Sequence, residues 1–303
     1  MKTFYSHGKL LLTAEYLVLD GAKALAVPTK KGQKLTITTS KTPGLHWKSI
    51  LADGTVWFET AFDINALKTQ SYFNEDPILQ RLGDILMAAL EQQPNFLDAS
   101  EGIQATSQLE FAKDWGLGSS STLLNNVALW AQINPYKLLS DTFGGSGYDI
   151  ACAKADTPIT YQRTKEDPIV NIISFCPSFR KQIFFIHLNQ KQNSRDSIAQ
   201  YRAIKKNHID VHLKQVNTFT DQMIQADSLE AFENIIDNHE SFLSEILQTP
   251  TVKNRLFPTY SGAIKSLGGW GGDFVMATGT PDDMTYFIER GYKTILSYDD
   301  MVL

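Results

Sequence analysis

A loop rich in glycine and serine precedes an apolar-faced helical pattern at residues 115–121, Trp-Gly-Leu-Gly-Ser-Ser-Ser. Glycine lets the backbone turn tightly and approach a ligand closely. A helix N-terminus adds free N–H donors and a partial positive charge. Together these features form a site for an anion, and phosphate is its commonest biological occupant. An ordinary glycine turn with a serine N-cap is the alternative when this segment is taken alone.

Two further segments, residues 6–21 and 265–274, favour the phosphate site. In this order the three segments resemble the motifs of the GHMP kinases, which are named for galacto-, homoserine, mevalonate and phosphomevalonate kinases. The central Gly-Leu-Gly-Ser-Ser motif is complete at residues 116–120, and the resemblance spans nearly the whole chain. The first motif is matched at Gly8, Lys9, Leu12, Glu15, Tyr16, Val18 and Gly21, and the third at Gly268, Gly271, Gly272 and Asp273.

A fourth segment, residues 144–151, resembles the mevalonate-type loop that holds the catalytic aspartate of this superfamily. It contains Gly-Tyr-Asp-Ile-Ala, the five residues by which a bacterial subgroup of GHMP kinases is labelled. The resemblance therefore points to Asp149 as the group that accepts or orients the proton of the substrate hydroxyl. A helix N-cap after a glycine loop is the other interpretation of Asp149.

The resemblance also implies ATP and magnesium (Mg²⁺) as cofactors and assigns roles around them. Lys9 would act in catalysis with Asp149 by balancing charge on the transferred group. Ser119 would contact phosphate oxygens, and Ser120 would ligate Mg²⁺, for which a hydroxyl is a suitable hard ligand. The residues expected to bind the cofactor are Gly116, Leu117, Gly118, Ser119, Ser120 and Ser121, and those expected to bind the substrate are Gly147, Tyr148, Arg195, Gly268, Gly269, Trp270 and Gly271.

Three positions depart from the superfamily pattern: His7 replaces a proline, Ala14 a glycine and Trp270 a glycine. An indole at a position with positive φ is unfavourable, so we expect a reshaped third loop with Trp270 covering the substrate pocket. Asp141 is the only acidic residue between residues 119 and 148, where relatives place a metal-binding glutamate, so it is the second predicted metal ligand.

Two other polar residues are expected to be structural. Glu15 would tie its strand to the phosphate loop, and His239 would be a partly buried packing residue on its helix.

The elements that must position these residues follow from periodicity and turn signals. Asp-Gly at residues 53–54 predicts a hairpin between residues 45–51 and 55–62. Asp-Pro at residues 76–77 predicts a helix start. Further predictions are strands near 35–37, 103–111, 158–163, 183–188 and 295–296, a short helix after residue 149, and helices over 229–246 and from 280 to 291.

These elements are compatible with the α+β architecture that the resemblance implies. The N-terminal, ATP-binding domain would be ribosomal protein S5 domain 2-like and span residues 1–166. The C-terminal GHMP domain would be ferredoxin-like and span residues 167–303.

Composition narrows the partners. A net charge of −5 without a long basic run argues against nucleic acid. No signal peptide is visible, and no stretch approaches the ~20 apolar residues that a membrane helix needs. Two cysteines, Cys152 and Cys176, are too few for a disulfide framework and favour the cytoplasm. We therefore expect a cytoplasmic protein with a small-molecule substrate, no nucleic-acid or membrane partner, and a homodimer as the candidate assembly.

The sequence as a whole predicts an ATP-dependent small-molecule kinase that transfers the γ-phosphate to a hydroxyl or phosphate of an anionic acceptor. Mevalonate and phosphomevalonate are the acceptors that the resemblance suggests. Two alternatives stay open: a lyase resembling diphosphomevalonate decarboxylase, and a non-catalytic GHMP-fold protein that binds a nucleotide or metabolite.

Overall fold

The computed structural model describes residues 1–98, 101–190, 194–204, 209–270 and 272–303. It is a mixed α+β structure whose main strands form two sheets. The chain divides into two compact units that alternate along the sequence, so the predicted boundary at residue 166 does not coincide with a change of unit. Unit 1 contains residues 1–8, 31–113 and 118–154, and unit 2 contains residues 9–30, 114–117 and 155–303.

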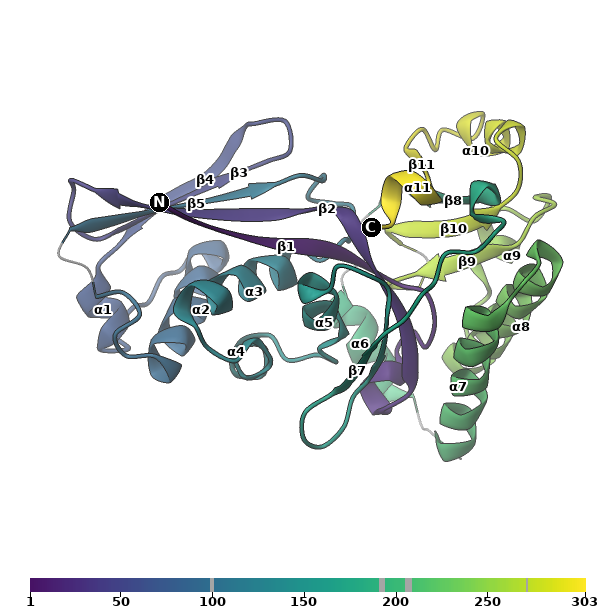
Figure 1. Cartoon of the computed structure of the whole chain (residues 1–303), viewed down its shortest axis with the longest axis horizontal. Helices are drawn as coiled ribbons and strands as arrows, with labels where there is room; N and C mark the ends of the chain where they lie inside the picture. Colours follow the sequence, from purple (N-terminus) through teal and green to yellow (C-terminus); the bar gives the residue numbers. More distant parts are fainter. Residues whose placement is uncertain (99–100, 191–193, 205–208, 271) are drawn as a thin grey trace. The chain divides into compact units, whose positions relative to one another are not determined.

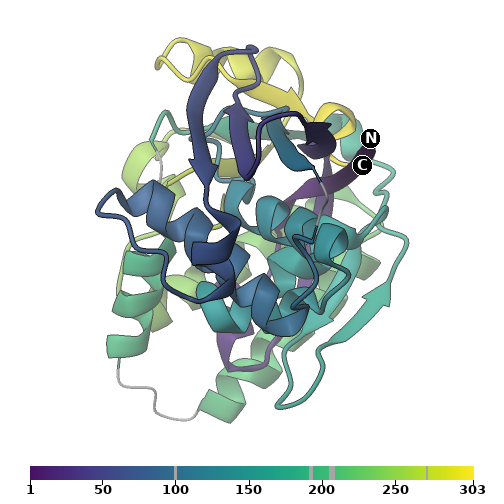
Figure 2. The same ribbon diagram turned by 90° about the vertical axis from the view of Figure 1, so that its left-hand side faces the viewer.

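Unit 1 is a sheet with helices on one face (Figures 1 and 2). Its strands follow the order β4-β3-β5-β2, and β1 pairs with β2. The β3–β5 pair is parallel, whereas β3–β4 and β2–β5 are antiparallel. The strands are β1 (Lys2–Leu11), β2 (Lys23–Ser40), β3 (Leu45–Ile50), β4 (Val56–Phe62) and β5 (Gly102–Leu109). The last residues of β1 and the first residues of β2 belong to unit 2. The helices are α1 (Ile64–Lys68), α2 (Pro77–Gln92), α3 (Ser119–Ala131), α4 (Pro135–Thr142) and α5 (Tyr148–Lys154).

The strands and helices predicted for unit 1 are confirmed. The Asp53-Gly54 turn joins the antiparallel pair β3–β4. Helix α2 begins at Pro77, and the Asp76 carboxylate accepts hydrogen bonds from the backbone N–H groups of residues 78 and 79. The apolar face of α2 packs with α3 and with the inner side of the sheet in one core, which includes Leu35, Trp47, Leu86, Leu124 and Val127.

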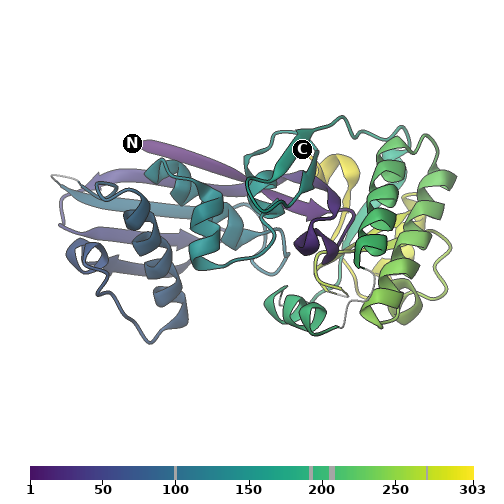
Figure 3. The same ribbon diagram turned by 90° about the horizontal axis from the view of Figure 1, so that it is seen from below.

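Unit 2 is built around an antiparallel sheet with strand order β11-β8-β10-β9. The helices α7 and α8 lie side by side (Figure 3). The start of β2 pairs with β6, which pairs with β7. The strands are β6 (Ile159–Gln162), β7 (Ile169–Ile172), β8 (Ile183–His187), β9 (Ile264–Leu267), β10 (Phe274–Thr278) and β11 (Ile295–Ser297). The helices are η1 (Leu17–Asp20), η2 (Arg180–Gln182), α6 (Ser194–Ala203), α7 (Ile209–Gln225), α8 (Leu229–Leu247), α9 (Val252–Leu256), η3 (Asp282–Met284), α10 (Thr285–Ile288) and α11 (Tyr298–Met301).

One predicted helix of unit 2 differs in form. The segment from residue 280 to Gly291 is the 3-10 turn η3 followed by the short helix α10, not one α-helix. The Asp283 carboxylate accepts hydrogen bonds from both the backbone N–H and the hydroxyl of Thr280, which tightens the first turn. The continuously buried strand β8 and the long helix α8 match their predictions. None of the helices in the described part of the chain is long and apolar enough to cross a membrane.

The Asp76 cap gives a direct test of the helix signal. Asp76→Ala should lower the free energy of unfolding by about 1 kcal/mol, because two N–H groups of α2 lose their acceptor. Asp76→Asn keeps an acceptor oxygen and should restore most of that stability. Urea unfolding followed by circular dichroism measures both, and equal losses in the two variants would contradict the capping role.

Candidate active site

The phosphate loop, residues 116–121, leads into α3 as predicted. Gly118 is the N-cap of α3 in the left-handed conformation (φ 88°), and the Thr122 N–H donates to its carbonyl at 2.9 Å. The described residues provide no side-chain cap for α3. The first N–H groups of this 13-residue helix therefore have no capping side chain, which is the arrangement that favours an anion at a helix N-terminus.

The three serines of the loop lie in different environments. Ser120 is exposed, as a residue that meets a ligand must be, and Ser119 is half-buried. Ser121 is only 6% exposed, and its hydroxyl donates to the Asp149 carboxylate. Successive residues of a helix point about 100° apart, which explains why neighbouring serines serve different partners. Sequence reasoning assigned Ser121 to the cofactor and missed its contact with Asp149.

Asp149 lies in the first turn of α5 and is brought to the phosphate loop by the preceding glycines. Gly144, Gly145 and Gly147 have φ values of 65°, 112° and 89°, conformations that side chains with a Cβ rarely adopt. The loop therefore turns sharply and lets α5 start against α3, with which it packs. Tyr148, at the start of α5, is partly buried. The predicted base thus contacts one serine of the predicted phosphate loop, Ser121, within unit 1.

Buried polar side chains fix the start of α3 on the sheet of unit 1. The Thr122 hydroxyl donates to Gln33 Oε1 at 2.5 Å, and the Gln33 amide donates to Ser107 Oγ at 2.7 Å. The Asn126 amide donates to the Gln33 carbonyl at 2.9 Å. Each group is largely removed from water, so breaking one contact leaves an unpaired polar atom and is costly. This network holds the phosphate loop in place.

Lys9 belongs to unit 2, where it lines a small cavity. Its backbone N–H donates to the Leu117 carbonyl at 3.1 Å. The cavity is also lined by Trp115, Gly116, Gly268 and Asp273, along with Leu10, Leu11, Leu267 and Phe274. It thus joins residues from all three superfamily motifs. Asp273, which is 9% exposed, is a polar lining residue that sequence reasoning did not place in the site.

Gly116 and Asp273 constrain each other in this cavity. Gly116 has φ 65°, and a Cβ built on it would lie 2.2 Å from Asp273 Cγ. Only a glycine therefore leaves room for the carboxylate. Asp273 itself has φ 54°, and its backbone is held by Asp273 N–H donating to the Gln190 carbonyl and by Leu188 N–H donating to its own carbonyl.

The third glycine loop, residues 268–272, accommodates Trp270 without a positive φ at that position. Among its described residues, Gly268 has positive φ (75°) and Trp270 does not. The Trp270 indole is buried and donates to the Pro250 carbonyl at 3.1 Å, while its backbone N–H donates to the Tyr16 hydroxyl at 2.8 Å. The indole therefore faces the interior of unit 2, and it is not among the described residues that line the cavity around Lys9. Gly271 lies outside the described residues.

Two further residues with a predicted role in binding are Asp141 and Arg195. Asp141 is exposed on α4 and forms an ion pair with Lys137, one helical turn earlier, at 2.8 Å. Arg195 falls in the first turn of α6, but its side chain lies outside the described part of the structure. No group of three or more histidine, cysteine or acidic side chains among the described residues has the arrangement of a metal site.

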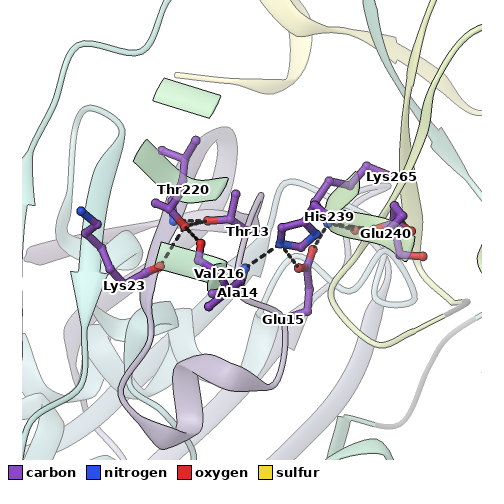
Figure 4. A network of polar contacts seen from close by, with 11 residues as sticks. Thr13, Ala14, Glu15, Lys23, Val216, Thr220, His239, Glu240 and Lys265 are labelled. Carbon is purple, nitrogen blue, oxygen red and sulfur yellow. Dashed lines mark hydrogen bonds and ion pairs between the residues drawn. The ribbon is translucent and has the colours of Figure 1, made fainter. Parts of the chain in front are cut away.

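A buried ion cluster, defined as Glu15, His239, Glu240 and Lys265, occupies the interior of unit 2 (Figure 4). Lys265 Nζ donates to Glu15 Oε1 at 2.5 Å and to Glu240 Oε1 at 3.0 Å. The Ala14 N–H donates to His239 Nε2 at 3.2 Å. The expectations for two residues need correction: Glu15 contacts β9 rather than the phosphate loop, and His239 is fully buried and accepts a hydrogen bond from the turn after β1.

Burial dominates the electrostatics of this cluster. It raises the pKa of Glu15 to about 7, although the positive charge of Lys265 acts against that shift. Burial likewise raises the pKa of Glu240 and, together with Lys265, holds the pKa of His239 well below its usual value. Burial acts to lower the pKa of Lys265, but the nearby carboxylates of Glu15 and Glu240 outweigh this effect and raise that pKa. Glu15 Oε2 has no hydrogen-bond partner among the described residues, which fits a carboxyl that holds a proton near neutrality.

These shifts predict opposing effects of pH on stability. Because the Glu15 pKa is raised, the folded state keeps a proton that the unfolded chain releases, so Glu15 adds stability as pH falls below about 7. Because the His239 pKa is lowered, the unfolded chain gains a proton below about 6.5, and His239 removes stability there. As the pH falls from about 7.5 to 5, the free energy of unfolding of Glu15→Gln should therefore drop relative to that of wild type by roughly 2 to 3 kcal/mol.

His239→Gln is the matched control, because a glutamine oxygen can still accept the Ala14 N–H. As the pH falls over the same interval, the free energy of unfolding of His239→Gln should rise relative to that of wild type. Guanidinium unfolding at a series of pH values measures both differences, and a constant difference for either variant would show that its group does not titrate as stated.

Known proteins resemble this chain in structure but not detectably in sequence. No protein-family model matches, and no curated protein matches. The structure of Streptococcus pneumoniae phosphomevalonate kinase in complex with phosphomevalonate and AMPPNP is similar, with a TM-score of 0.71 and 15% identity over 98% of this chain and 100% of that one. Methanococcus jannaschii mevalonate kinase gives a TM-score of 0.69 and 14% identity, covering 97% and 96% of the two chains. Lactococcus lactis galactokinase complexed with galactose gives 0.70 and 12%, covering 100% and 93%. The chain thus has the fold of these GHMP kinases.

Proposed function

We propose that the protein is an ATP-dependent small-molecule kinase of the GHMP type. The observation that carries the proposal is the hydrogen bond from Ser121 to Asp149, because it joins the predicted phosphate loop to the predicted catalytic carboxylate within one unit. The fold shared with mevalonate, phosphomevalonate and galactose kinases supports the same reaction class. Phosphoryl transfer needs mainly positioning and charge stabilisation, which such an arrangement provides.

Each part of the site has a role in this proposal. The N–H groups at the start of α3 bind the nucleotide phosphates, and the exposed Ser120 hydroxyl is available as a ligand for Mg²⁺. Asp149 orients the acceptor hydroxyl and takes its proton, with one carboxylate oxygen held by Ser121. Lys9 supplies positive charge for the transferred group. Asp141, already paired with Lys137, is the weaker candidate for a metal ligand.

The acceptor that we propose is a small anionic alcohol or phosphate such as mevalonate or phosphomevalonate. The motif resemblance supports this class, and the similar structures include kinases for both compounds. We further propose that the two sheets correspond to an S5-like N-terminal and a ferredoxin-like C-terminal domain, as the resemblance implies.

Removing the proposed base tests the mechanism. Asp149→Asn should lower kcat by about 10²- to 10⁴-fold, the usual contribution of a general base, while the ATP dissociation constant stays within about threefold. ADP release should be measured with mevalonate, phosphomevalonate and galactose as acceptors, and ATP binding by calorimetry. Asp141→Asn tests the weaker metal-ligand candidate separately, and an unchanged Mg²⁺ dependence would leave Asp141 only as the partner of Lys137.

The outcomes separate the alternatives. Tight ATP binding without turnover on any acceptor would favour a binding protein, and release of carbon dioxide from mevalonate diphosphate would favour a lyase. Full activity of Asp149→Asn would exclude the proposed base.

The two neighbouring serines should separate positioning from cofactor binding. Ser121→Ala removes a hydrogen bond to a carboxylate and should lower kcat by about 10- to 100-fold, with ATP affinity retained. Ser120→Ala should instead raise the Mg²⁺ concentration needed for half-maximal rate. Steady-state kinetics at varied ATP and Mg²⁺ measure both effects, and a loss of ATP affinity in Ser121→Ala would return that residue to the cofactor site.

A further inference from the structure

Lys265 joins two segments that are far apart in the sequence. It lies on β9, is 0% exposed, and directs its ammonium to three acceptors: Glu15 Oε1 at 2.5 Å, Glu240 Oε1 at 3.0 Å and the Ser266 carbonyl at 3.2 Å. An ammonium has three donors, so the contacts account for all of them. The lysine is therefore enclosed and cannot itself touch a ligand.

The segments that Lys265 joins are those that form the cavity around Lys9. Glu15 follows the end of β1, whose last residues line that cavity, and Lys265 on β9 precedes the cavity residues Leu267, which ends β9, and Gly268. The ion pair therefore ties together the two segments that continue into the cavity lining. It limits how far these segments can separate, because a buried charge must keep its partner or bear a large desolvation penalty.

The same cluster and its neighbour Tyr16 also contact the third glycine loop and the strand before it. The Ser266 N–H donates to Glu240 Oε2 at 3.2 Å, and the Tyr16 hydroxyl, next in sequence to Glu15, accepts the Trp270 N–H. Ala14 and Tyr16 on either side of Glu15 have φ values of 64° and 63°, which are unfavourable for residues other than glycine. Such a turn persists where its surroundings fix it, and the cluster provides that fixation.

We propose that Lys265 is a positioning residue: through Glu15 and Glu240 it sets the place of Lys9 and of the third glycine loop for the reaction. The catalytic part of this inference rests on the proposed function, whereas the placement of the loop does not. Glu15 was predicted to be structural and Lys265 was given no role, and both side chains are buried.

Hydrogen exchange of single amides tests the placement without any turnover. Lys265→Met keeps an unbranched side chain but removes the charge. In this variant the Trp270 and Ser266 amides should exchange at least about tenfold faster than in the matched control Thr220→Val. Thr220 is also 0% exposed and belongs to the polar network of Figure 4, where its hydroxyl contacts Thr13 and the Lys23 carbonyl but not Lys265. Equal exchange in the two variants at equal global stability would overturn the proposal.

Kinetics give the second readout, with Glu15→Gln as the conservative variant. A glutamine keeps an oxygen for the Lys265 ammonium, so Glu15→Gln should retain slow exchange at Trp270 and at least about half of kcat at pH 8, where its stability effect is small. Lys265→Met should lower kcat at least about tenfold, with the ATP dissociation constant changed less than about threefold. If ATP affinity falls by the same factor as kcat, the role of Lys265 is merely structural.

Two further cases keep the test decisive. If Lys265→Met does not fold, the double variant Lys265→Met/Glu15→Gln replaces it, because its one remaining buried carboxyl can hold a proton. The same increase in exchange at the Trp270 and Ser266 amides is expected for this double variant. If no acceptor is phosphorylated by wild type, the proposed function fails, while the exchange rates still decide whether Lys265 positions the loop.

Discussion

A buried ammonium between two carboxylates is the constraint on which unit 2 depends. Removing three ionic groups from water is costly, and the arrangement is tolerable only when every donor finds an acceptor at close range. Lys265 meets this condition with Glu15, Glu240 and its neighbouring carbonyl. The turn after β1, the strand β9 and the helix α8 therefore cannot shift independently of one another. Some residues of a ligand-binding sequence motif, such as Glu15, therefore support the motif from the interior.

Much of the fold could be predicted because its signals are local. The Asp53-Gly54 hairpin and the Asp76 cap depend on a few adjacent residues, and the glycines before Asp149 fix a sharp turn by their own conformational freedom. The phosphate loop with the carboxylate of Asp149 beside it was likewise predictable, although only through the resemblance of several motifs.

What could not be predicted depends on contacts between distant residues. His239 looks like a packing residue on an amphipathic helix, and only its contact with Ala14, 225 positions away, reveals its role as an acceptor. Ser121 was placed with its neighbours because periodicity alone does not say which serine faces inward. Trp270 was expected to reshape its loop and cover the substrate pocket, but the backbone at that position has no positive φ and the buried indole donates to the Pro250 carbonyl. In each case the deciding partner lies outside the motif.

The alternation of the two units along the chain limits how this protein can be taken apart. Residues 9–30 and 114–117 interrupt unit 1, so neither unit is encoded by one continuous stretch. A fragment that stops at residue 154 would retain the start of β2 but lack β6, and would expose the backbone edge at Lys23–Ala26 that β6 covers. Exposed edges of this kind invite aggregation. Truncation and limited proteolysis are therefore poor routes to an isolated unit, and only redesigned connections that gather each unit's segments would yield one.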